Sequence, residues 1–370
     1  MRFPEFSGEW IESKLGDIAD FSKGAGISKD QRSEEGNPCI LYGELYTRYK
    51  SEVITNVFSK TALPDSNLVK SKANDIIIPA SGETAEDIAT ARCVPFDNIL
   101  LGGDLNIIRL HEQDGKFFSY QLNGVRKYDI ATVAQGVSVV HLHAGDLKGI
   151  TVKYASHIAE QEKISQILGL IDDRIATQSK IIAEQETLLR SLRHKIYSRV
   201  QVESQCTIAD VLCYEQPTKY LVTDTDYTDD DSQVPVLTAN KAFILGYTTE
   251  NFGIYDKGPC IILDDFTLDC KYVDFKFKVK SSAIKILRAK AKTNLRFIFE
   301  YFRFLELNTT EHRRHYIAEI EPMSILLPSN EEIDRVARLF TALDERLDAV
   351  RKELKILESQ KMYMLQKMFI

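Results

Sequence analysis

The chain has 370 residues, of which 44% are hydrophobic and 27% charged, and its formal net charge at pH 7 is −7. This composition is typical of a globular protein of about two or three domains. The negative net charge excludes the class of nucleic-acid-binding proteins that carry a large overall excess of positive charge. No apolar run approaches the roughly 18 residues that span a bilayer, and residues 1–6 lack the apolar core of a secretory signal. The six cysteines form no C-x-x-C pair, so we expect reduced, mostly buried thiols.

The first 155 residues predict a mixed α+β domain whose strand order the sequence does not define. A short amphipathic segment at 7–21 opens this domain. Short apolar runs bounded by turn residues predict strands, residues 117–127 predict a helix, and the Gly-containing stretch 135–138 predicts a loop. The predicted strands lie at 37–42, 75–79, 98–110 (interrupted by Gly102 and Gly103) and 150–152.

A long helix is expected over 156–200. Ser156 suits its N-cap, and Glu160 and Glu162 suit the positive end of the helix dipole. At 1.5 Å per residue this helix would be about 60 Å long. Seam positions separated alternately by four and three residues predict that it packs lengthwise on another helix. These positions are Ile164, Leu168, Ile171, Ile175, Gln178, Ile182, Gln185, Leu189, Leu192 and Ile196.

The same seam recurs 172 residues later, in the same phase. Asp172-Asp173-Arg174-Ile175 recurs as Asp344-Glu345-Arg346-Leu347. Two matched helices predict an internally duplicated chain, in which the helices form an antiparallel pair with each other. Polar seam residues such as Gln178, Gln185 and Lys361 can fix the register of such a pair at some cost in stability. The second set of positions is Val336, Phe340, Leu343, Leu347, Val350, Leu354, Leu357, Lys361, Met364 and Met368.

The segment between the two helices predicts a second α+β domain, over 201–327. Its start repeats the N-terminal segment, because Leu15-Gly16-Asp17-Ile18 aligns with Ile208-Ala209-Asp210-Val211. Strands are predicted at 234–237 and 260–263, and alternating apolar residues predict a further strand over 272–279. Residues 295–307 predict a helix. Ser329 and Glu332 form a capping box that starts the last helix, over 328–370.

The sequence contains few of the patterns that carry chemistry. There is no G-x-x-x-x-G-K-[ST] loop, no G-x-G-x-x-G and no aromatic-flanked double proline, so neither nucleotide binding nor a self-contained methyltransferase is expected. The acidic run at 224–231 has Thr228 and Asp229 where a calcium loop needs a ligand and a glycine, and is expected to be a solvated loop. His141 and His143 lack a third metal ligand. No nucleophile–base spacing stands out.

Basic, amide and aromatic residues in predicted loops are the remaining candidates for binding. Arg and Lys suit phosphates and guanine edges, whereas Asn and Gln suit adenine edges. An ordinary charged surface is the alternative interpretation of these residues. The candidate DNA-binding residues are Lys23, Lys29, Tyr42, Arg48, Lys50 and Arg92 in the first domain, and Gln216, Thr218, Lys219, Tyr220, Asn240, Lys241, Arg313, Arg314, His315 and Tyr316 in the second.

Taken together, several segments resemble the specificity (S) subunit of type I restriction–modification systems, over essentially the whole chain. The second long helix departs from the pattern, because Glu332-Ile333 stands where the family has Glu-Gln. The segments that carry the resemblance are 2–10 with 15–18 at the start of the chain, 160–164 with 170–172 in the first long helix, and 215–220, 246–248 and 264–267 in the second domain.

The resemblance implies an α+β fold with two α/β target recognition domains separated by two long antiparallel coiled-coil helices, in a pseudo-two-fold internal duplication. The expected parts are target recognition domain 1 (1–155), the central helix (156–200), target recognition domain 2 (201–327) and the C-terminal helix (328–370). Each recognition domain would bind one half of a bipartite, asymmetric target in double-stranded DNA. The chain itself would be non-catalytic and cytoplasmic, in a bacterium or archaeon.

The resemblance also implies protein partners and places every cofactor in them. Two modification subunits would dock on the helices, bind S-adenosylmethionine and methylate adenine N6. Restriction subunits would add translocation and cleavage that depend on ATP and Mg, and no membrane would be involved. Two alternatives stay open: a coiled-coil adaptor whose domains bind proteins, and a nuclease acting alone through a metal or nucleophile constellation.

Overall fold

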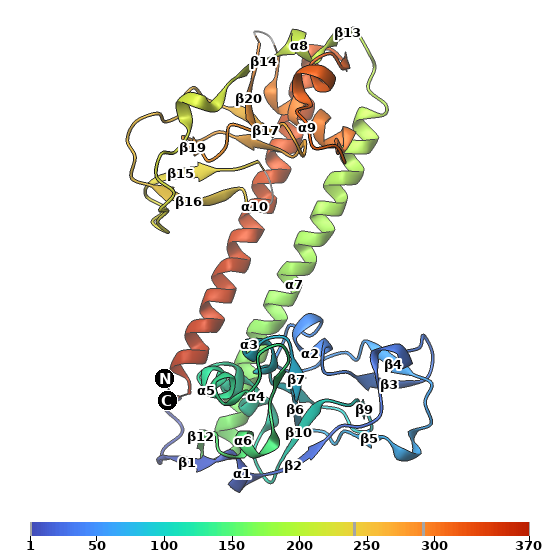
Figure 1. The fold of residues 1–370 in the computed structure, drawn as a ribbon, viewed down its shortest axis with the longest axis vertical. Coiled ribbons are helices and arrows are strands. Elements are labelled where there is room, and N and C mark those ends of the chain that lie inside the picture. Colours follow the sequence, from blue (N-terminus) through green and yellow to red (C-terminus); the bar gives the residue numbers. More distant parts are fainter. Residues whose placement is uncertain (1, 240–241, 291–292, 370) are drawn as a thin grey trace. The chain divides into compact units, whose positions relative to one another are not determined.

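The computed structural model describes residues 2–239, 242–290 and 293–369, which form two compact units (Figure 1). Unit 1 comprises Met1–Ser179 and Lys352–Ile370, and unit 2 comprises Lys180–Arg351. Helices α7 (Ile158–Tyr197) and α10 (Asn330–Lys367) lie within the expected ranges 156–200 and 328–370, and each contributes one segment to each unit. Each unit is therefore an α/β domain joined to a pair of helix segments.

The strands of unit 1 form two four-stranded sheets and two small pairs. One sheet has the order β2-β10-β6-β8 and the other β4-β3-β9-β5, while β1 pairs with β12 and β7 with β11. The strands are β1 (Trp10–Lys14), β2 (Ala19–Lys23), β3 (Asn37–Ile40), β4 (Ser59–Thr61), β5 (Val69–Lys70), β6 (Asp75–Pro79), β7 (Ser81–Gly82), β8 (Arg92–Val94), β9 (Leu100–Leu101), β10 (Leu105–Leu110), β11 (Val140–His141) and β12 (Thr151–Ala155).

Helix α4 joins the domain of unit 1 to its helix pair. Asp114 caps α4 by accepting hydrogen bonds from two backbone N–H groups of its first turn, and Phe117 and Phe118 are fully buried. Leu365 and Phe369, at the end of the chain, belong to the same core. The helices of the unit 1 domain are α1 (Leu15–Ile18), α2 (Glu44–Thr47), α3 (Ala85–Ile88), α4 (Gly115–Asn123), α5 (Lys127–Val133), α6 (Ala144–Lys148), and the 3₁₀ turns η1 (Lys29–Gln31) and η2 (Asp65–Asn67).

Unit 2 has the strand orders β14-β20-β17-β18 and β16-β15-β19, and β13 pairs with β21. Its strands are β13 (Ser204–Thr207), β14 (Leu212–Glu215), β15 (Val234–Leu237), β16 (Ile244–Thr248), β17 (Cys260–Asp264), β18 (Cys270–Val273), β19 (Lys278–Val279), β20 (Ile284–Ala289) and β21 (Ser324–Leu327). Its helices are α8 (Ile208–Val211), α9 (Leu295–Leu305), the 3₁₀ turn η3 (Pro217–Tyr220) and the short π-helix η4 (Tyr316–Ile320).

The two units have matching topologies, so the predicted duplication extends through both sheets. The order β2-β10-β6-β8 corresponds to β14-β20-β17-β18, and the pair β1–β12 corresponds to β13–β21. Even the parallel pair β3–β9 has its counterpart in the parallel pair β15–β19. The predicted internal duplication is confirmed, and the match that the sequence indicated between α1 and α8 is part of it.

The helix segments pair antiparallel within each unit, as the recurrent seam predicted. In unit 1, Asp172 pairs with Lys361 and Arg174 with Glu353. In unit 2, Glu186 pairs with Arg351, and the Arg193 guanidinium lies 5.6 Å from the centre of the Phe340 ring. In both units the partner's number falls as the number along α7 rises. The predicted seam positions are buried or half-buried throughout.

Two sequence-based predictions of local structure were wrong. The alternating stretch 272–279 is not one strand, because β18 ends at Val273 and β19 begins only at Lys278, in the other sheet. Its alternation persists because Phe277 is buried in a different core from that of Tyr272. The helix predicted over 117–127 is α4, which ends at Asn123, and the separate helix α5 was not predicted.

Candidate nucleic-acid interface

The helix pair of unit 1 holds its domain through a buried charged cluster. Lys361 donates to Glu52 and lies 2.7 Å from Asp172 Oδ1, while Asp172 Oδ2 accepts hydrogen bonds from Tyr120 (2.7 Å) and Ser51 (2.8 Å). Burial and the Asp172 charge raise the pKa of Glu52, and Lys361 opposes this. Burial disfavours the charged form of Lys361, but the two carboxylates hold its pKa above the ordinary value. The cluster therefore joins both helices to the β3–β4 connection.

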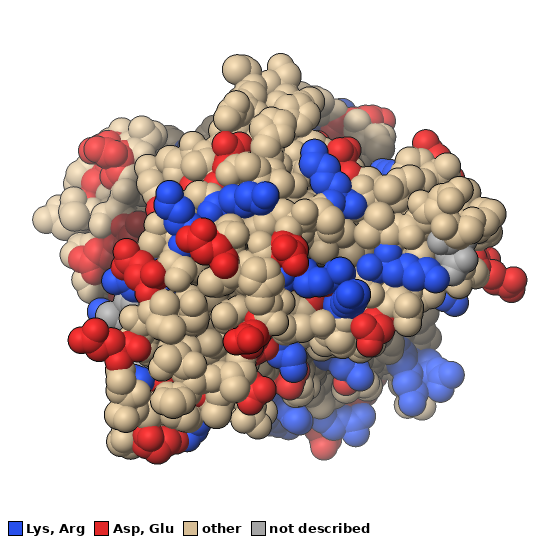
Figure 2. Space-filling model, turned by 90° about the horizontal axis from the view of Figure 1, so that it is seen from below, with Lys and Arg blue, Asp and Glu red and all other residues tan. Residues whose placement is uncertain are grey.

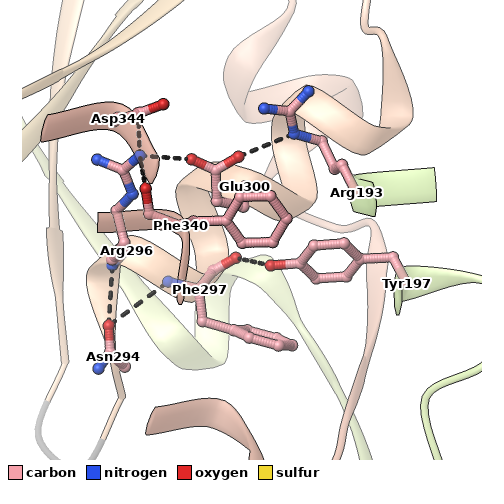
Figure 3. A network of polar contacts seen from close by, with 8 residues as sticks. All are labelled: Arg193, Tyr197, Asn294, Arg296, Phe297, Glu300, Phe340 and Asp344. Atoms are coloured by element: carbon pink, nitrogen blue, oxygen red, sulfur yellow. Dashed lines mark hydrogen bonds and ion pairs between the residues drawn. The ribbon is translucent and has the colours of Figure 1, made fainter. Parts of the chain in front are cut away.

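Unit 2 attaches its domain at the equivalent place with different residues (Figure 3). Glu300 on α9 accepts hydrogen bonds from Arg193 and Arg296, each at 2.8 Å, and Arg296 also pairs with Asp344 on α10. Tyr197 donates to the Phe297 carbonyl at 2.7 Å. Asp344 is the repeat of Asp172, 172 residues later. The first residue of the duplicated Asp-rich sequence thus anchors the domain helix in both units.

The segments 2–10 and 160–164, which resemble the family pattern, contact each other. Arg2 donates two hydrogen bonds of 2.8 Å to the carboxylate of Glu160, whose side chain is fully buried. The ion pair raises the pKa of Arg2. Gln161 bridges the Ala155 carbonyl and the backbone N–H of Asp114, so both residues tie the start of α7 to the domain.

Most of the basic candidates in unit 1 are exposed. Lys23 lies at the end of β2, Lys29 begins η1, and Lys50 follows α2. Tyr42 is half-buried after β3. Arg48 pairs with Glu44 at 2.9 Å, and its guanidinium lies 4.7 Å from the centre of the Phe58 ring. Tyr42, Arg48 and Lys50 belong to the β3–β4 connection, and the exposed cations of unit 1 can contact phosphates.

Arg92 does not fit its predicted role in DNA contact. Its side chain is buried, and it donates to the Leu45 carbonyl (3.1 Å) and the Tyr49 carbonyl (2.9 Å). Burial lowers the pKa of its guanidinium, and the carboxylates of Glu52 and Asp172 oppose this. Arg92 was predicted to contact DNA because it is an arginine, but its side chain instead holds the end of α2 against β8.

In unit 2, η3 presents one group of candidates. Gln216, Thr218 and Lys219 are exposed, whereas Tyr220 is buried and donates from its hydroxyl to Glu215 at 2.8 Å, which does not fit a base contact. Lys257, which the sequence did not single out, lies 2.7 and 2.9 Å from the two Glu215 oxygens. Burial opposes ionisation of Glu215, but the hydrogen bonds from Lys257 and Tyr220 hold its pKa below the ordinary value.

The second group of candidates in unit 2 lies at the turn before η4. Arg313 pairs with Glu311 and Glu319. Arg314 is exposed, with its guanidinium 6.0 Å from the centre of the Phe266 ring. Arg314 is therefore the freest cation of this group toward solvent, while Arg313 is held by carboxylates of its own chain.

His315 and Tyr316 are buried and do not fit a direct contact with DNA. Their backbone N–H groups donate to Asp265 Oδ1 at 3.1 and 2.8 Å. Asp264 accepts from the N–H groups of Phe266 and Thr267, so the 264–267 motif shapes and holds this turn. The candidates Asn240 and Lys241 lie outside the described residues.

The charges on the surface are mixed. Figure 2 shows a face on which Lys and Arg side chains alternate with Asp and Glu side chains. Within 2–239, 242–290 and 293–369, no three His, Cys, Asp or Glu side chains are grouped so as to hold a metal ion. No helix in this part of the chain is both long and apolar enough to cross a membrane.

Comparison with known proteins identifies related domains and folds. Residues 7–187 match the family described as type I restriction modification DNA specificity domain. The type I restriction enzyme EcoR124I/EcoR124II specificity subunit of Escherichia coli is 41% identical over 175 residues. That match covers 43% of this chain and 43% of the relative, so the chain aligns with less than half the relative's length.

Solved structures resemble the chain over its whole length. The S subunit of a type I restriction–modification system from M. genitalium has a TM-score of 0.71 at 16% identity, covering 100% of this chain and 99% of that one. A chain from a structure of type I R-M complex assembly and conformational transition has a TM-score of 0.55 at 11% identity, covering 99% and 98%. At these identities the likeness shows the fold. Residues 7–187 therefore match a type I restriction modification DNA specificity domain, and the chain as a whole shares the fold of the solved S subunit.

Proposed function

We propose that this chain is the DNA sequence-specificity subunit of a type I restriction–modification complex. Each α/β domain would bind one half of a bipartite, asymmetric target in double-stranded DNA. The observation that carries the proposal is that the two units repeat the same sheets and helix pair but differ in the loops between their strands. A repeated scaffold with different loops suits the recognition of two different half-sites. The exposed cations around the β3–β4 connection, at η3 and at Arg314 would contact phosphates and base edges.

The chemistry would belong to partner subunits. The chain would position two modification subunits, which bind S-adenosylmethionine and methylate adenine N6, and restriction subunits that use ATP and Mg. We expect the purified chain to bind DNA weakly, because its net charge of −7 offers little attraction to phosphates. The lengths of α7 and α10 would set the number of base pairs between the half-sites.

Co-expression with a neighbouring adenine methyltransferase tests this function. We expect N6-methyladenine to map to one bipartite motif with a fixed spacer. A complex that is folded but leaves the DNA unmethylated would contradict the proposal. Whether the methyltransferase gene lies beside this one is the simplest observation to make first.

Substitution of exposed charged residues in unit 2 distinguishes DNA recognition from the adaptor alternative. Replacing Arg314 by Ala should reduce methylation at one half-site at least ten-fold, with the assembled complex intact. Arg338→Ala is a suitable control, because Arg338 is exposed on the long helix α10 and is not part of a domain loop. Unchanged methylation by the Arg314 variant, and by a Lys219→Ala variant, would favour an adaptor for this domain.

A further inference from the structure

The two units differ most where the domain faces its helix pair. In unit 1 the β3–β4 connection is long, and its residues 52–54 lie along the outer edge of β8. Cys93 donates its backbone N–H to the Glu52 carbonyl (2.8 Å) and accepts from the Ile54 N–H (2.9 Å). The Glu52 side chain then reaches Lys361 in the helix pair. Unit 1 thus covers a strand edge and supplies a carboxylate to its helices from its own chain.

Unit 2 has no such cover among its described residues. The β15–β16 connection consists only of residues 238–243. Strand β18 is the last of its sheet, and no strand or isolated bridge in the described part of the chain pairs with its outer edge. Tyr272 takes the place of Cys93, since Cys93 pairs with Ile76 and Tyr272 with the equivalent Ile261. As far as residues 242–290 and the other described residues show, the edge of β18 is open to another strand.

A hollow of about 540 Å³ lies beside this open edge. It is lined from α7, α9, α10 and β18, with Tyr272, Arg193, Arg303 and Asp344 among its walls. All of these residues belong to unit 2. Asp344 corresponds to Asp172, which Ser51 and Lys361 contact in unit 1. The hollow therefore opens next to the position that the β3–β4 connection contacts in unit 1.

The described residues of unit 2 offer the cations at this hollow no counterpart of Glu52, although Glu300 accepts a hydrogen bond from Arg193 Nε. The Arg193 side chain is only 5% exposed, and its Nη2 has no hydrogen-bond partner among the described residues. Figure 3 shows its terminal nitrogens pointing away from Glu300. Arg190, Lys271 and Arg303 also line the hollow and make no ion pair or hydrogen bond through their side chains with the described residues. Burial and the charge of Arg193 lower the pKa of Arg303, whereas the carboxylates of Glu300 and Asp344 oppose this shift.

We propose that the β18 edge and this hollow bind an extended segment of a partner protein, whose acidic side chain enters the hollow as Glu52 does in unit 1. Strand addition to an open edge gives such binding its main-chain hydrogen bonds, and the side-chain pocket gives it specificity. The inference rests on the proposed function, which makes a modification subunit the partner. A single protein carboxylate suits the hollow better than duplex DNA, because it can lie beside Arg193 and Arg303, whereas the many phosphates of DNA would also meet the carboxylates of the lining.

Hydrogen exchange of the full chain, alone and with the modification subunit, tests the strand edge. We expect amide exchange in peptides covering 270–275 to slow at least ten-fold when the complex forms. Peptides covering β8 provide the internal control, because Cys93 is already hydrogen-bonded to residues 52 and 54 and should exchange equally in both samples.

Charge reversal tests the acidic side chain. Arg303→Glu should weaken binding of the modification subunit at least ten-fold, and Arg303→Gln should weaken it less. Lys280→Glu, at an exposed lysine that follows β19 and does not line the hollow, should bind as the wild type does. Because Arg303 makes no ion pair in the described part of the chain, its variants should fold, which thermal unfolding would check.

The possible outcomes separate this inference from the proposed function. If the complex forms and methylates DNA but residues 270–275 exchange as in the free chain, the inference fails and the proposed function stands. Equal binding by Arg303→Glu and Lys280→Glu would also overturn it. Protection by a DNA duplex alone would assign the site to phosphate instead. If the wild-type chain forms no complex, both the proposed function and the inference are contradicted.

Discussion

Unit 1 and unit 2 share one topology but attach their domains to the helix pair differently. In unit 1 a lysine on α10 lies between two buried carboxylates, and a long loop supplies one of them. In unit 2 a glutamate on α9 lies between two arginines, and the corresponding loop is short. The comparison shows that the duplication preserved the frame and one anchoring aspartate per unit. The connections between strands β3–β4 and β15–β16 diverged.

Neither attachment is an efficient source of stability. Removing paired charges from water costs roughly what their attraction returns, whereas removing one partner leaves a buried charge uncompensated. Such clusters restrict which alternative packings are possible, because a shifted register would bury the charges unpaired. We therefore interpret both clusters as devices that fix the register between domain and helix pair.

The largest effect is expected from Lys361→Met in unit 1. It leaves Glu52 and Asp172 buried without their cation, which should destabilise unit 1 by up to about 5 kcal/mol. The single tryptophan, Trp10, packs 5.7 Å from Phe117 in this unit, so its fluorescence during urea unfolding reports on unit 1.

A neutralised cluster provides the control for that substitution. The triple variant Glu52→Gln, Asp172→Asn and Lys361→Met removes all three charges, and it should recover most of the stability lost in the single variant. If the triple variant were as unstable as Lys361→Met, hydrogen-bond geometry rather than unpaired charge would dominate the cluster.

The corresponding substitution in unit 2 is Glu300→Gln. It leaves Arg193 without a carboxylate, but Arg296 keeps Asp344, so the loss should be smaller, about 3 kcal/mol. Hydrogen exchange along α9 measures it. Glu345→Gln, at an exposed glutamate of α10, should change exchange little. A larger loss in Glu300→Gln than in Lys361→Met would reverse the order of the two attachments.

Removal of the equivalent N-cap residues of α4 and α9 should cause a smaller difference in stability between the two units. Asp114→Ala removes the cap and also the acceptor of the 2.6 Å hydrogen bond from Ser165, so about 2 kcal/mol should be lost. Asn294→Ala should cost about 1 kcal/mol. Trp10 fluorescence measures the first loss and hydrogen exchange in α9 the second. Equal losses would show that the Ser165 hydrogen bond contributes little.

The sequence predicted the frame well because the frame has a periodic signal. The seam from Ile164 and its repeat from Val336 gave the helix pair, and the match of 15–18 with 208–211 extended the duplication into the domains. The prediction of one strand over 272–279 was wrong, because an alternation of apolar and polar residues does not show where the chain passes from one sheet to the other. Nothing local marks Ser51 or Glu52 as helix contacts, since their partners Asp172 and Lys361 lie 121 and 309 residues away.

The candidate site was predicted less well, because residue type alone does not report burial. Arg92 and Tyr316 have side chains that often contact DNA, yet one binds backbone carbonyls and the other is in the core. Lys257 could not be found from sequence, since its partner Glu215 is 42 residues away and no motif joins them. Exposed residues at loop tips, such as Lys50 and Arg314, stay the better predictions.

The smallest expected difference between the units is the pH dependence of stability that comes from the histidines preceding α6 and η4. His143 is exposed, whereas the equivalent His315 is buried. The Glu311 carbonyl raises the pKa of His315, burial opposes this, and the Glu319 carboxylate 3.0 Å away raises it further. The folded state thus favours the charged form. Its stabilising contribution should be complete below the unfolded pKa of about 6.5, and should disappear as the pH rises through the raised value.

Hydrogen exchange of residues 316–320 across pH 5.5–8.5, corrected for intrinsic exchange, measures this dependence. Protection should fall as the pH rises in the wild type, and His315→Gln should flatten the profile. His143→Gln is the matched control in unit 1 and should keep the wild-type profile at η4. Protection that increases with pH would mean that the turn holds neutral His315. The Glu319 contact would then not stabilise the charged form, and the buried position alone would distinguish the two histidines.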